Sequence, residues 1–312
     1  DPARIEAGIH YTLSKMAEDG HVYAPQDELE PEAAEILQVP AERVSAVLES
    51  LENSELVRRE TLTYPTADER WPTAANGAVV REERAVYLPA LYFSETGLTR
   101  QVRRLVEHPT SRLTGVIASS LAAVGGRPSA VDSLTAQQRQ AITATLSHKL
   151  TILTGGPGTG TTTTLRTLLD TLDASGHTYG LASPTGRAAK RLTEATGREA
   201  KTIHRLLEFK PGEGFGRNEN DPIDADLIVI DEASMLDLVL AYSLLRAIGS
   251  DSHLLLVGDI DQLPSVGAGD VLRDLIASDV AAVVRLETIF RQAANSLIIR
   301  NAHRINQGLM PE

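Results

Sequence analysis

The stretch Thr151-Ile-Leu-Thr-Gly-Gly-Pro-Gly-Thr-Gly-Thr-Thr-Thr163 decides the fold, because an apolar strand pattern runs directly into a glycine-rich loop and then into a helical pattern of leucines. Glycines allow backbone N–H groups to point inward around a phosphate, and the N-terminus of the following helix adds partial positive charge. A glycine-rich loop alone is also compatible with a plain tight turn, but the flanking strand and helix favour a phosphate-binding loop. The pattern GxxxxGK[ST] is met at Gly155, Gly160 and Thr162, whereas its lysine position holds Thr161.

A pair of carboxylates follows a second apolar run. Leu227-Ile-Val-Ile230 leads directly into Asp231 and Glu232. A carboxylate at the end of a buried strand can hold Mg²⁺ through its water shell, and its neighbour can orient and deprotonate an attacking water. Such a pair is common on protein surfaces, but after a phosphate-binding loop it indicates the other half of a nucleotide site. Together the two motifs predict a P-loop NTPase.

From Leu134 onward, helical patterns alternate with short apolar runs. This alternation predicts an α/β fold with a parallel sheet whose two faces are covered by helices. The expected strands are residues 150–153, 179–182, 227–230, 254–257 and 281–286.

Two polar residues follow the last two of these strands. Gln262 comes after the run 254–257, and a glutamine at a strand end can hydrogen-bond a γ-phosphate. Arg291 comes after the run 281–286, where its guanidinium could neutralise the same phosphate. An ordinary polar turn and a surface arginine at a helix start are the alternatives.

Six segments in this order resemble a RecD-like superfamily 1 DNA helicase. They are the glycine-rich loop, SPTGRAAKRL (183–192), TIHRLL (202–207), VIDEASM (229–235), GDIDQLPSVGAG (258–269) and IFRQAANSLIIRNAHRIN (289–306). The segment LTAQQRQA (134–141) also looks like the Q motif of that family. The resemblance implies a RecA-like motor domain that uses ATP and Mg²⁺. It further implies 5′-to-3′ movement along single-stranded DNA and unwinding at duplex junctions, in DNA repair or recombination.

The resemblance also implies roles for the matching positions. Thr162 and Asp231 would hold Mg²⁺, and Glu232 would activate the attacking water. Gln262 and Arg291 would contact the γ-phosphate. The nucleotide-binding set, with the first residue on the adenine, would be Gln138, Gly156, Pro157, Gly158, Thr159, Gly160, Thr161, Thr162 and Thr163.

A separate set would line the single strand. Short hydroxyl side chains, backbone amides and one arginine suit a grip on phosphates that does not read bases. The residues are Pro184, Thr185, Gly186, Arg187, Thr202 and His204. For Arg187 and His204, a solvated or packed side chain is the alternative.

Glycines between two short aromatic-bearing runs predict a β-hairpin at about residues 206–223. In the family it resembles, a hairpin at this point separates the strands of the duplex. Phe209, Lys210 and Phe215 would then act in strand separation. A surface hairpin without a role is the alternative.

The predicted architecture has four parts. Residues 1–95 show the order helix, strand, helix, helix, hairpin, which predicts a smaller, mostly helical, winged-helix-like module that contacts DNA or docks a protein. Its second helix is expected at 32–37 and its last strand within 79–93. A helical connector, with a helix over 98–121, occupies 96–130, the motor domain 131–285, and an incomplete second motor domain 286–312.

Composition sets limits on these interpretations. The 312 residues carry 30 basic and 42 acidic side chains, a net charge of −12, so DNA binding should be confined to one local groove and weaken with salt. There is no cysteine, which excludes thiolate catalysis and thiolate metal sites. No stretch of the sequence reaches the length and apolarity of a membrane span or opens as a secretory signal, so a cytoplasmic location is expected.

Thr161 is the main departure from the family pattern. A neutral hydroxyl cannot replace the cation that bridges the β- and γ-phosphates, so feeble hydrolysis is expected. The chain also stops before the motifs of a second motor domain, which suggests a fragment of a longer enzyme. A non-hydrolysing nucleotide- or DNA-binding module is the competing hypothesis. A P-loop kinase or signalling NTPase is a more distant one, because it leaves residues 183–192 and 202–207 unexplained.

Overall fold

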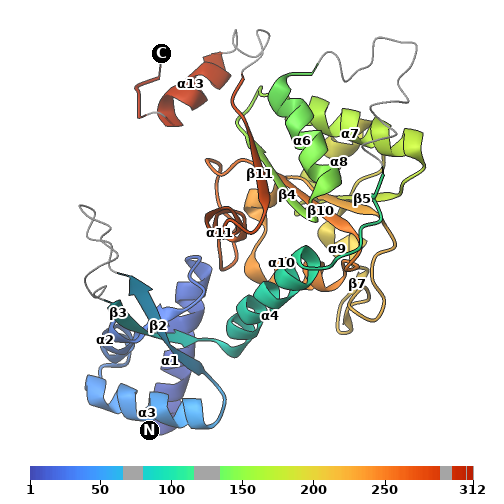
Figure 1. Ribbon diagram of the computed structural model, residues 1–312. Coiled ribbons are helices and arrows are strands. Elements are labelled where there is room, and N and C mark those ends of the chain that lie inside the picture. Colours follow the sequence, from blue (N-terminus) through green and yellow to red (C-terminus); the bar gives the residue numbers. More distant parts are fainter. Residues whose placement is uncertain (66–79, 116–133, 289–296, 307, 312) are drawn as a thin grey trace, which may run out of the picture. The chain divides into compact units, whose positions relative to one another are not determined.

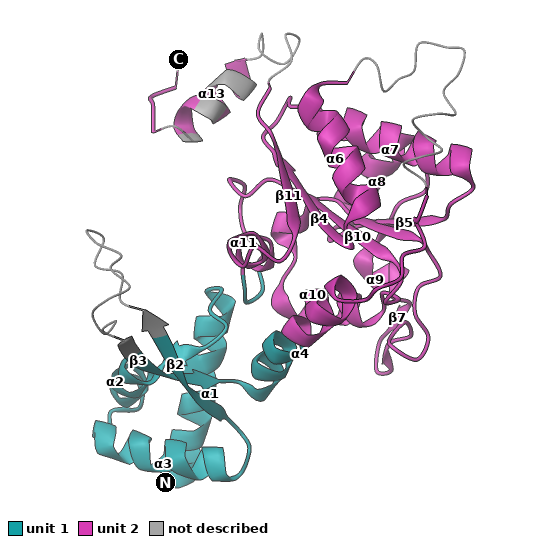
Figure 2. Cartoon of the chain, in the orientation of Figure 1, with its two compact units in different colours: residues 1–97, 266–269 teal, residues 98–265, 270–312 magenta. Residues whose placement is uncertain are grey.

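The computed structural model describes residues 1–65, 80–115, 134–288, 297–306 and 308–311. The chain divides into two units, shown in teal and magenta in Figure 2. Unit 1 comprises Asp1–Gly97 and Val266–Gly269, and unit 2 comprises Leu98–Ser265 and Asp270–Glu312.

Unit 1 packs helices around a small antiparallel sheet of order β1-β3-β2. In chain order its elements are α1 (Pro2–Glu18), β1 (Ala24–Pro25), α2 (Gln26–Leu37), α3 (Ala41–Asn53), β2 (Arg58–Pro65) and β3 (Val80–Tyr87). Apolar residues at helical spacing on α1, such as Ile5 and Ile9, are buried in one core with Leu48 of α3. The element order is the one that the sequence predicts.

Three expected boundaries in this part of the chain were wrong. Helix α2 begins at Gln26, six residues before the expected start at 32. Strand β3 ends at Tyr87, because Pro89 begins helix α4 (Pro89–Val106), and proline is favoured in a first helical turn. Helix α4 ends well before residue 121. Pro109 follows His108, and a proline disfavours the helical conformation of the residue before it.

Unit 2 is built on a parallel six-stranded sheet of order β11-β4-β10-β9-β5-β6 (Figure 1). The strands are β4 (Leu150–Gly155), β5 (Tyr179–Ser183), β6 (Lys201–Thr202), β9 (Leu227–Ile230), β10 (His253–Gly258) and β11 (Ala282–Leu286). All five expected strands are present, and β6 is an addition. This doubly wound parallel sheet confirms the predicted fold class.

Helices cover both faces of the sheet. They are α6 (Ala136–Ser147), α7 (Thr161–Ser175), α8 (Gly186–Thr196), α9 (Ile203–Leu206), α10 (Leu238–Arg246) and α11 (Val271–Ala277). A further helix, α13 (Leu297–Asn306), follows β11 along the chain. The β4–α7–β5 and β5–α8–β6 connections run toward one edge, whereas the connections through α10 and α11 run toward the other. Since such crossovers are right-handed, α7 and α8 lie on one face, and α10 and α11 lie on the opposite face.

The central strands are buried on both faces. Ile152 of β4 and Val229 of β9 are completely buried, and Leu169 of α7 packs in the same core as Val229. A parallel sheet buried in this way presents polar backbone and side-chain groups only at the two ends of its strands. Within the described part of the chain, no helix is both long enough and apolar enough to cross a bilayer.

Candidate nucleotide site and single-strand path

The glycine-rich loop lies at the carboxyl end of β4 and leads into α7. Gly158 and Gly160 have φ values of 85° and 87°, the left-handed region that glycine occupies without strain. Helix α7 begins at Thr161, and no side chain caps its first turn. The first N–H groups of an α-helix have no partner within the helix, so this end of α7 is suited to an anion.

Close packing fixes the shape of the loop. A Cβ atom at Gly155 would lie 2.7 Å from Oγ1 of Thr159 and 2.9 Å from the carbonyl oxygen of Leu286 in β11. Thr159 is 2% exposed, and its hydroxyl donates to Gly156 O at 2.8 Å. Any larger residue at position 155 would therefore displace either the loop or β11.

Gln138 joins helix α6 to the loop. Its Oε1 accepts from the Thr135 N–H at 3.0 Å in a capping box, and its Nε2 donates to Gly160 O at 3.3 Å. The side chain is 1% exposed. These contacts give Gln138 a place in holding the loop, and its role toward adenine stays a prediction.

The two carboxylates follow β9, as predicted. Burial, with a smaller contribution from the charge of Glu232, raises the pKa of Asp231 to about 6. Glu232 has a φ of 55°, a conformation that costs free energy for a residue with a side chain and is found mostly where function requires it. Asp231 is thus a buried acid whose pKa no cation among the described residues lowers, which suits a metal ligand.

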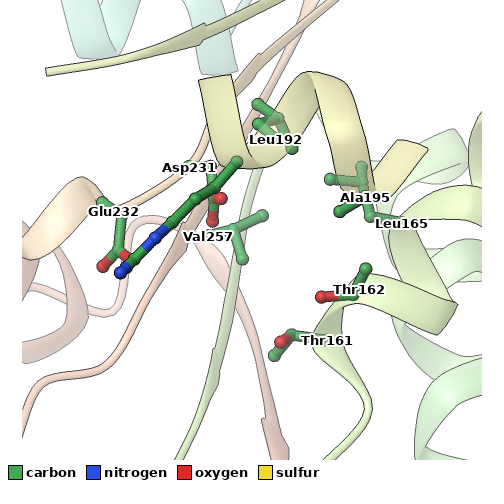
Figure 3. Close-up of a pocket in the computed structure, with 9 residues that line it drawn as sticks. Thr161, Thr162, Leu165, Leu192, Ala195, Asp231, Glu232 and Val257 are labelled. Carbon is green, nitrogen blue, oxygen red and sulfur yellow. The ribbon is translucent and has the colours of Figure 1, made fainter. Parts of the chain in front are cut away.

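A pocket of about 210 Å³ brings the two motifs together (Figure 3). Thr161 and Thr162, at the start of α7, lie across the pocket from Asp231 and Glu232. The full lining is Thr161, Thr162, Leu165, Arg191, Leu192, Ala195, Asp231, Glu232 and Val257. Thr163 and the loop residues 156–160 do not line this pocket.

The donor set fits Mg²⁺. A hydroxyl and a carboxylate are oxygen ligands of the kind that Mg²⁺ prefers, and this ion usually completes its shell with phosphates and water. The described residues contain no group of three or more His, Asp or Glu side chains that could hold a metal ion by themselves. Thr162 and Asp231 are therefore the residues that would hold Mg²⁺ beside a bound nucleotide.

Gln262 does not line this pocket, and Arg291 lies outside the described residues. Gln262 is exposed beyond β10, and its Nε2 donates to Oδ2 of Asp259 at 3.4 Å. The end of β10 is close to the carboxylate motif, because a Cβ at Gly258 would lie 3.0 Å from the Ser234 N–H nitrogen. Arg291 falls in residues 289–296, which the structure does not describe.

The residues expected to line the single strand meet at the carboxyl edge of the same sheet. Strands β5 and β6 are parallel, with Ser183 opposite Thr202, so the segments 184–187 and 202–204 begin side by side. Thr185 and Thr202 are the N-cap residues of α8 and α9, and each hydroxyl accepts a backbone N–H of its own helix. The structure thus brings both segments together, and their contact with DNA stays a prediction.

The predicted hairpin is present as β7 (Phe209–Lys210) and β8 (Gly214–Phe215). Phe209 and Phe215 pack on each other with ring centroids 5.1 Å apart. The ring of His204 lies 5.5 Å from Phe209 and 5.7 Å from Phe215. The hairpin is therefore connected to the expected single-strand path by one aromatic cluster. Lys210 is exposed beside Glu213.

In unit 1, two arginines at the start of β2 have acidic partners. Arg58 forms an ion pair with Glu55, and Arg59 forms one with Glu52 of α3. Such pairing reduces the positive charge that this face offers to a phosphate, so the docking alternative for the module stays open.

Sequence reasoning assigned no role to Arg191, which lines the pocket from α8. The available signal was the spacing of Arg187, Arg191 and Ala195, because residues four apart share a helix face. That spacing places Arg191 on a stripe between the expected DNA segment and the pocket.

Comparison with known proteins agrees with this geometry. A family described as an AAA domain matches residues 138–268. The ATP-dependent RecD2 DNA helicase of Deinococcus radiodurans is 35% identical over 313 residues, which is 100% of this chain and 41% of that protein. The chain is thus similar to RecD-like helicases over its whole length. The RecD-like chain is also 41% identical over 182 residues to the RecBCD enzyme subunit RecD of Mycobacterium tuberculosis, which is 50% of this chain and 32% of that protein.

The RecD-like chain spans 41% of the length of the Deinococcus relative. Among solved structures, the Pif1 helicase of Candida albicans is 23% identical with a TM-score of 0.44, covering 57% of this chain and 45% of that one.

Proposed function

We propose that this RecD-like chain is the nucleotide-binding motor part of an ATP-dependent DNA helicase. It binds ATP with Mg²⁺, moves 5′-to-3′ on single-stranded DNA and unwinds duplex junctions in DNA repair or recombination. Two relatives whose names contain DNA helicase or RecD support the class of activity. The polarity and the cellular role rest on the family resemblance alone.

One observation carries the proposal: helix α8 belongs to both candidate sites. Its first turn follows Pro184 and Thr185 in the expected single-strand path, whereas Leu192 and Ala195, further along it, line the nucleotide pocket. Because a helix is rigid, a change of the pocket on nucleotide binding or hydrolysis shifts the DNA-contacting end as well. A motor needs such a mechanical link between its two ligands.

The pocket assigns distinct tasks to its residues. Thr162 and Asp231 hold Mg²⁺, which supplies positive charge to the phosphates when it is bound. Glu232 accepts a proton from the attacking water and orients it. Thr161 offers no positive charge, and the loss of one preorganised electrostatic contact costs about 3 kcal/mol of barrier, about a hundredfold in rate.

Thr161 also supports a second candidate function. A pocket that binds ATP and Mg²⁺ but hydrolyses slowly could serve as a nucleotide-dependent switch for single-strand binding. In that case nucleotide would change DNA affinity without any strand displacement.

Two assays on the 312-residue chain separate the candidates. The first measures ATP hydrolysis with and without poly(dT), and the second measures displacement of a labelled strand from forks with a 5′ or a 3′ tail. A helicase motor shows hydrolysis stimulated by DNA and displacement from the 5′-tailed fork. A switch shows ATP-dependent binding of poly(dT) and neither of these activities. A chain that binds neither ATP nor DNA contradicts both.

The hairpin is tested separately by deleting residues 210–217. We expect the deletion to abolish strand displacement and to spare binding of poly(dT), because residues 184–187 and 202–204 remain in the chain. Unchanged displacement by an otherwise active enzyme would remove the hairpin from the mechanism.

A further inference from the structure

The nucleotide pocket has an unbalanced set of charges. Two carboxylates, those of Asp231 and Glu232, face it, and position 161 contributes a neutral hydroxyl. The triphosphate of ATP adds further negative charge. Among the described residues that line the pocket, one side chain is basic, that of Arg191 on α8.

Three neighbouring basic side chains, on α7 and on or just after α8, are engaged elsewhere. Arg166 donates to Ala195 O, and the ammonium of Lys190 lies 3.9 Å from Glu194 on the exposed surface of α8. Arg198 is held by Asp170 and Asp173. Lys149 cannot reach the site either, because it lies at the opposite end of β4 and donates to Ser250 O at 2.7 Å. By contrast, no hydrogen bond or ion pair holds Arg191 to any described residue.

The position of Arg191 follows from the packing of α8. Ala188, Ala189 and Leu192 are buried, so these residues fix the rotation of the helix against the sheet. Arg191 and Ala195 are four residues apart and therefore share a face of α8, and both line the pocket. Ala195 lies on the side of Leu165 and Thr162 (Figure 3).

We propose that Arg191 supplies the positive charge on the nucleotide phosphates that position 161 lacks in this chain. This inference rests on the proposed function, because it requires the pocket to bind a nucleoside triphosphate. A guanidinium is permanently charged, and its planar fork of donors matches phosphate oxygens in a bidentate geometry. A long arginine on a facing helix can thus act where the loop itself offers only a hydroxyl.

The expected size of the effect follows from charge-assisted hydrogen bonds. Removing such contacts from a phosphate weakens binding by about tenfold to a hundredfold. The effect should be large for ATP, smaller for ADP and absent for AMP, because AMP lacks the phosphates nearest to the site. A lysine at position 161 would supply the same charge, so it should make Arg191 partly redundant.

The experiment measures the Kd of fluorescent ATP, ADP and AMP analogues with Mg²⁺ by titration of the full 312-residue chain. The variants are Arg191→Gln, Arg191→Lys, Thr161→Lys and the double variant Thr161→Lys/Arg191→Gln. Lys190→Gln is the matched control, because it removes the same charge from the adjacent residue of α8. Thermal unfolding without nucleotide checks that each variant is folded.

We expect Arg191→Gln to weaken ATP binding about tenfold or more, Arg191→Lys to weaken it less, and Lys190→Gln to leave it unchanged. In the Thr161→Lys background, the effect of Arg191→Gln should fall below about threefold.

Two results would overturn the inference while the proposed function stands. One is equal ATP affinity of the folded Arg191→Gln and Lys190→Gln variants in a chain that binds ATP. The other is loss of the Arg191→Gln effect when Glu232→Gln is also present, which would show that Arg191 only balances that carboxylate. If the unmodified chain binds no ATP, the proposed function itself fails.

Discussion

The two ends of the parallel sheet in unit 2 both carry charged groups, but only one end leaves them unpaired. At the amino ends of the strands, Lys149 donates to the carbonyl oxygens of Ser250 and Ser252, and Arg112 pairs with Asp251 at 2.9 Å. Arg104 of α4 donates to the carbonyl oxygens of Leu245 and Ile248, at 2.9 and 2.7 Å. Here every named cation has its acceptors, so this end stabilises the fold.

At the carboxyl ends the arrangement is the reverse. Asp231 is buried beside another acid, Glu232 has a strained backbone, and Arg191 has no partner among the described residues. The hydroxyls of Ser183 and Ser234 are buried here without a hydrogen-bond partner, and one such hydroxyl, that of Thr151, lies near the amino end of β4. Unpaired polar groups cost stability, and they are retained where a ligand completes them.

The test with the largest expected effect removes the proposed general base, Glu232, at the carboxyl end. Glu232→Gln should lower the rate of ATP hydrolysis by about a hundredfold to ten-thousandfold, because general base catalysis contributes that much, with little change in ATP affinity. Single-turnover hydrolysis, in the unmodified chain and in Thr161→Lys, measures the effect. An unaltered rate in both backgrounds would place the base elsewhere.

The second test restores the charge in the loop. Thr161→Lys should raise DNA-stimulated ATP hydrolysis by up to about a hundredfold in the Arg191→Gln variant, where it returns one preorganised electrostatic contact to the phosphates. The gain should be smaller where Arg191 already supplies that charge. Steady-state phosphate release with saturating poly(dT) is the measurement, and Thr163→Lys serves as a control outside the pocket. No gain in rate would mean that the charge at position 161 does not limit the reaction.

The third test disturbs the amino end. Arg104→Met should lower the free energy of unfolding by about 2 kcal/mol, because the carbonyl oxygens of Leu245 and Ile248 lose their charged donor. Urea unfolding measures this, and ATP affinity should not change under native conditions. The exposed neighbour Arg103→Met is the control, with an effect below about 0.5 kcal/mol. If Arg104→Met changed ATP affinity as strongly as stability, the two ends would not be separable.

The fourth test concerns the dependence of stability on pH. The pKa of Asp231 is raised from 3.8 to about 6, so between those values the folded chain keeps a proton that the unfolded chain loses. The contribution of Asp231 to stability therefore falls as pH rises through this window. Asp231→Asn should increase the free energy of unfolding at about pH 7.5 by about 2 kcal/mol and flatten the pH dependence below about pH 6.

Asp251 at the amino end should behave in the opposite way. Burial alone would raise its pKa, but hydrogen bonding and the charge of Arg112 lower it overall. Its stabilising contribution is present above the ordinary pKa and is lost as pH falls. Asp251→Asn should thus lower the free energy of unfolding at about pH 7.5, as measured by urea titration. The same sign for both variants would contradict the contrast between the two ends.

Much of the fold could be predicted from the sequence. All five expected strands of the motor domain are present, because continuous apolar runs bounded by turn residues are a local signal of buried parallel strands. The hairpin at Phe209 and Phe215 was predicted for a similar reason. The ends of α4 near Pro89 and Pro109 were not predicted correctly. The apolar pattern continues past both prolines, whereas the backbone restrictions of proline set where the helix begins and ends.

The sequence predicted the separate motifs of the candidate site, and only the fold brings those motifs together. The sequence by itself determined which chemical groups stand at the strand ends, because Asp231, Glu232 and the glycine-rich loop are local patterns. The tertiary structure decided that β10 separates β4 from β9, which places Thr161 and Thr162 across one pocket from those carboxylates. It also decided the raised pKa of Asp231, the partners of Lys149 and the freedom of Arg191. These properties depend on burial and on neighbours distant in sequence, and such neighbours are fixed only when the sheet assembles.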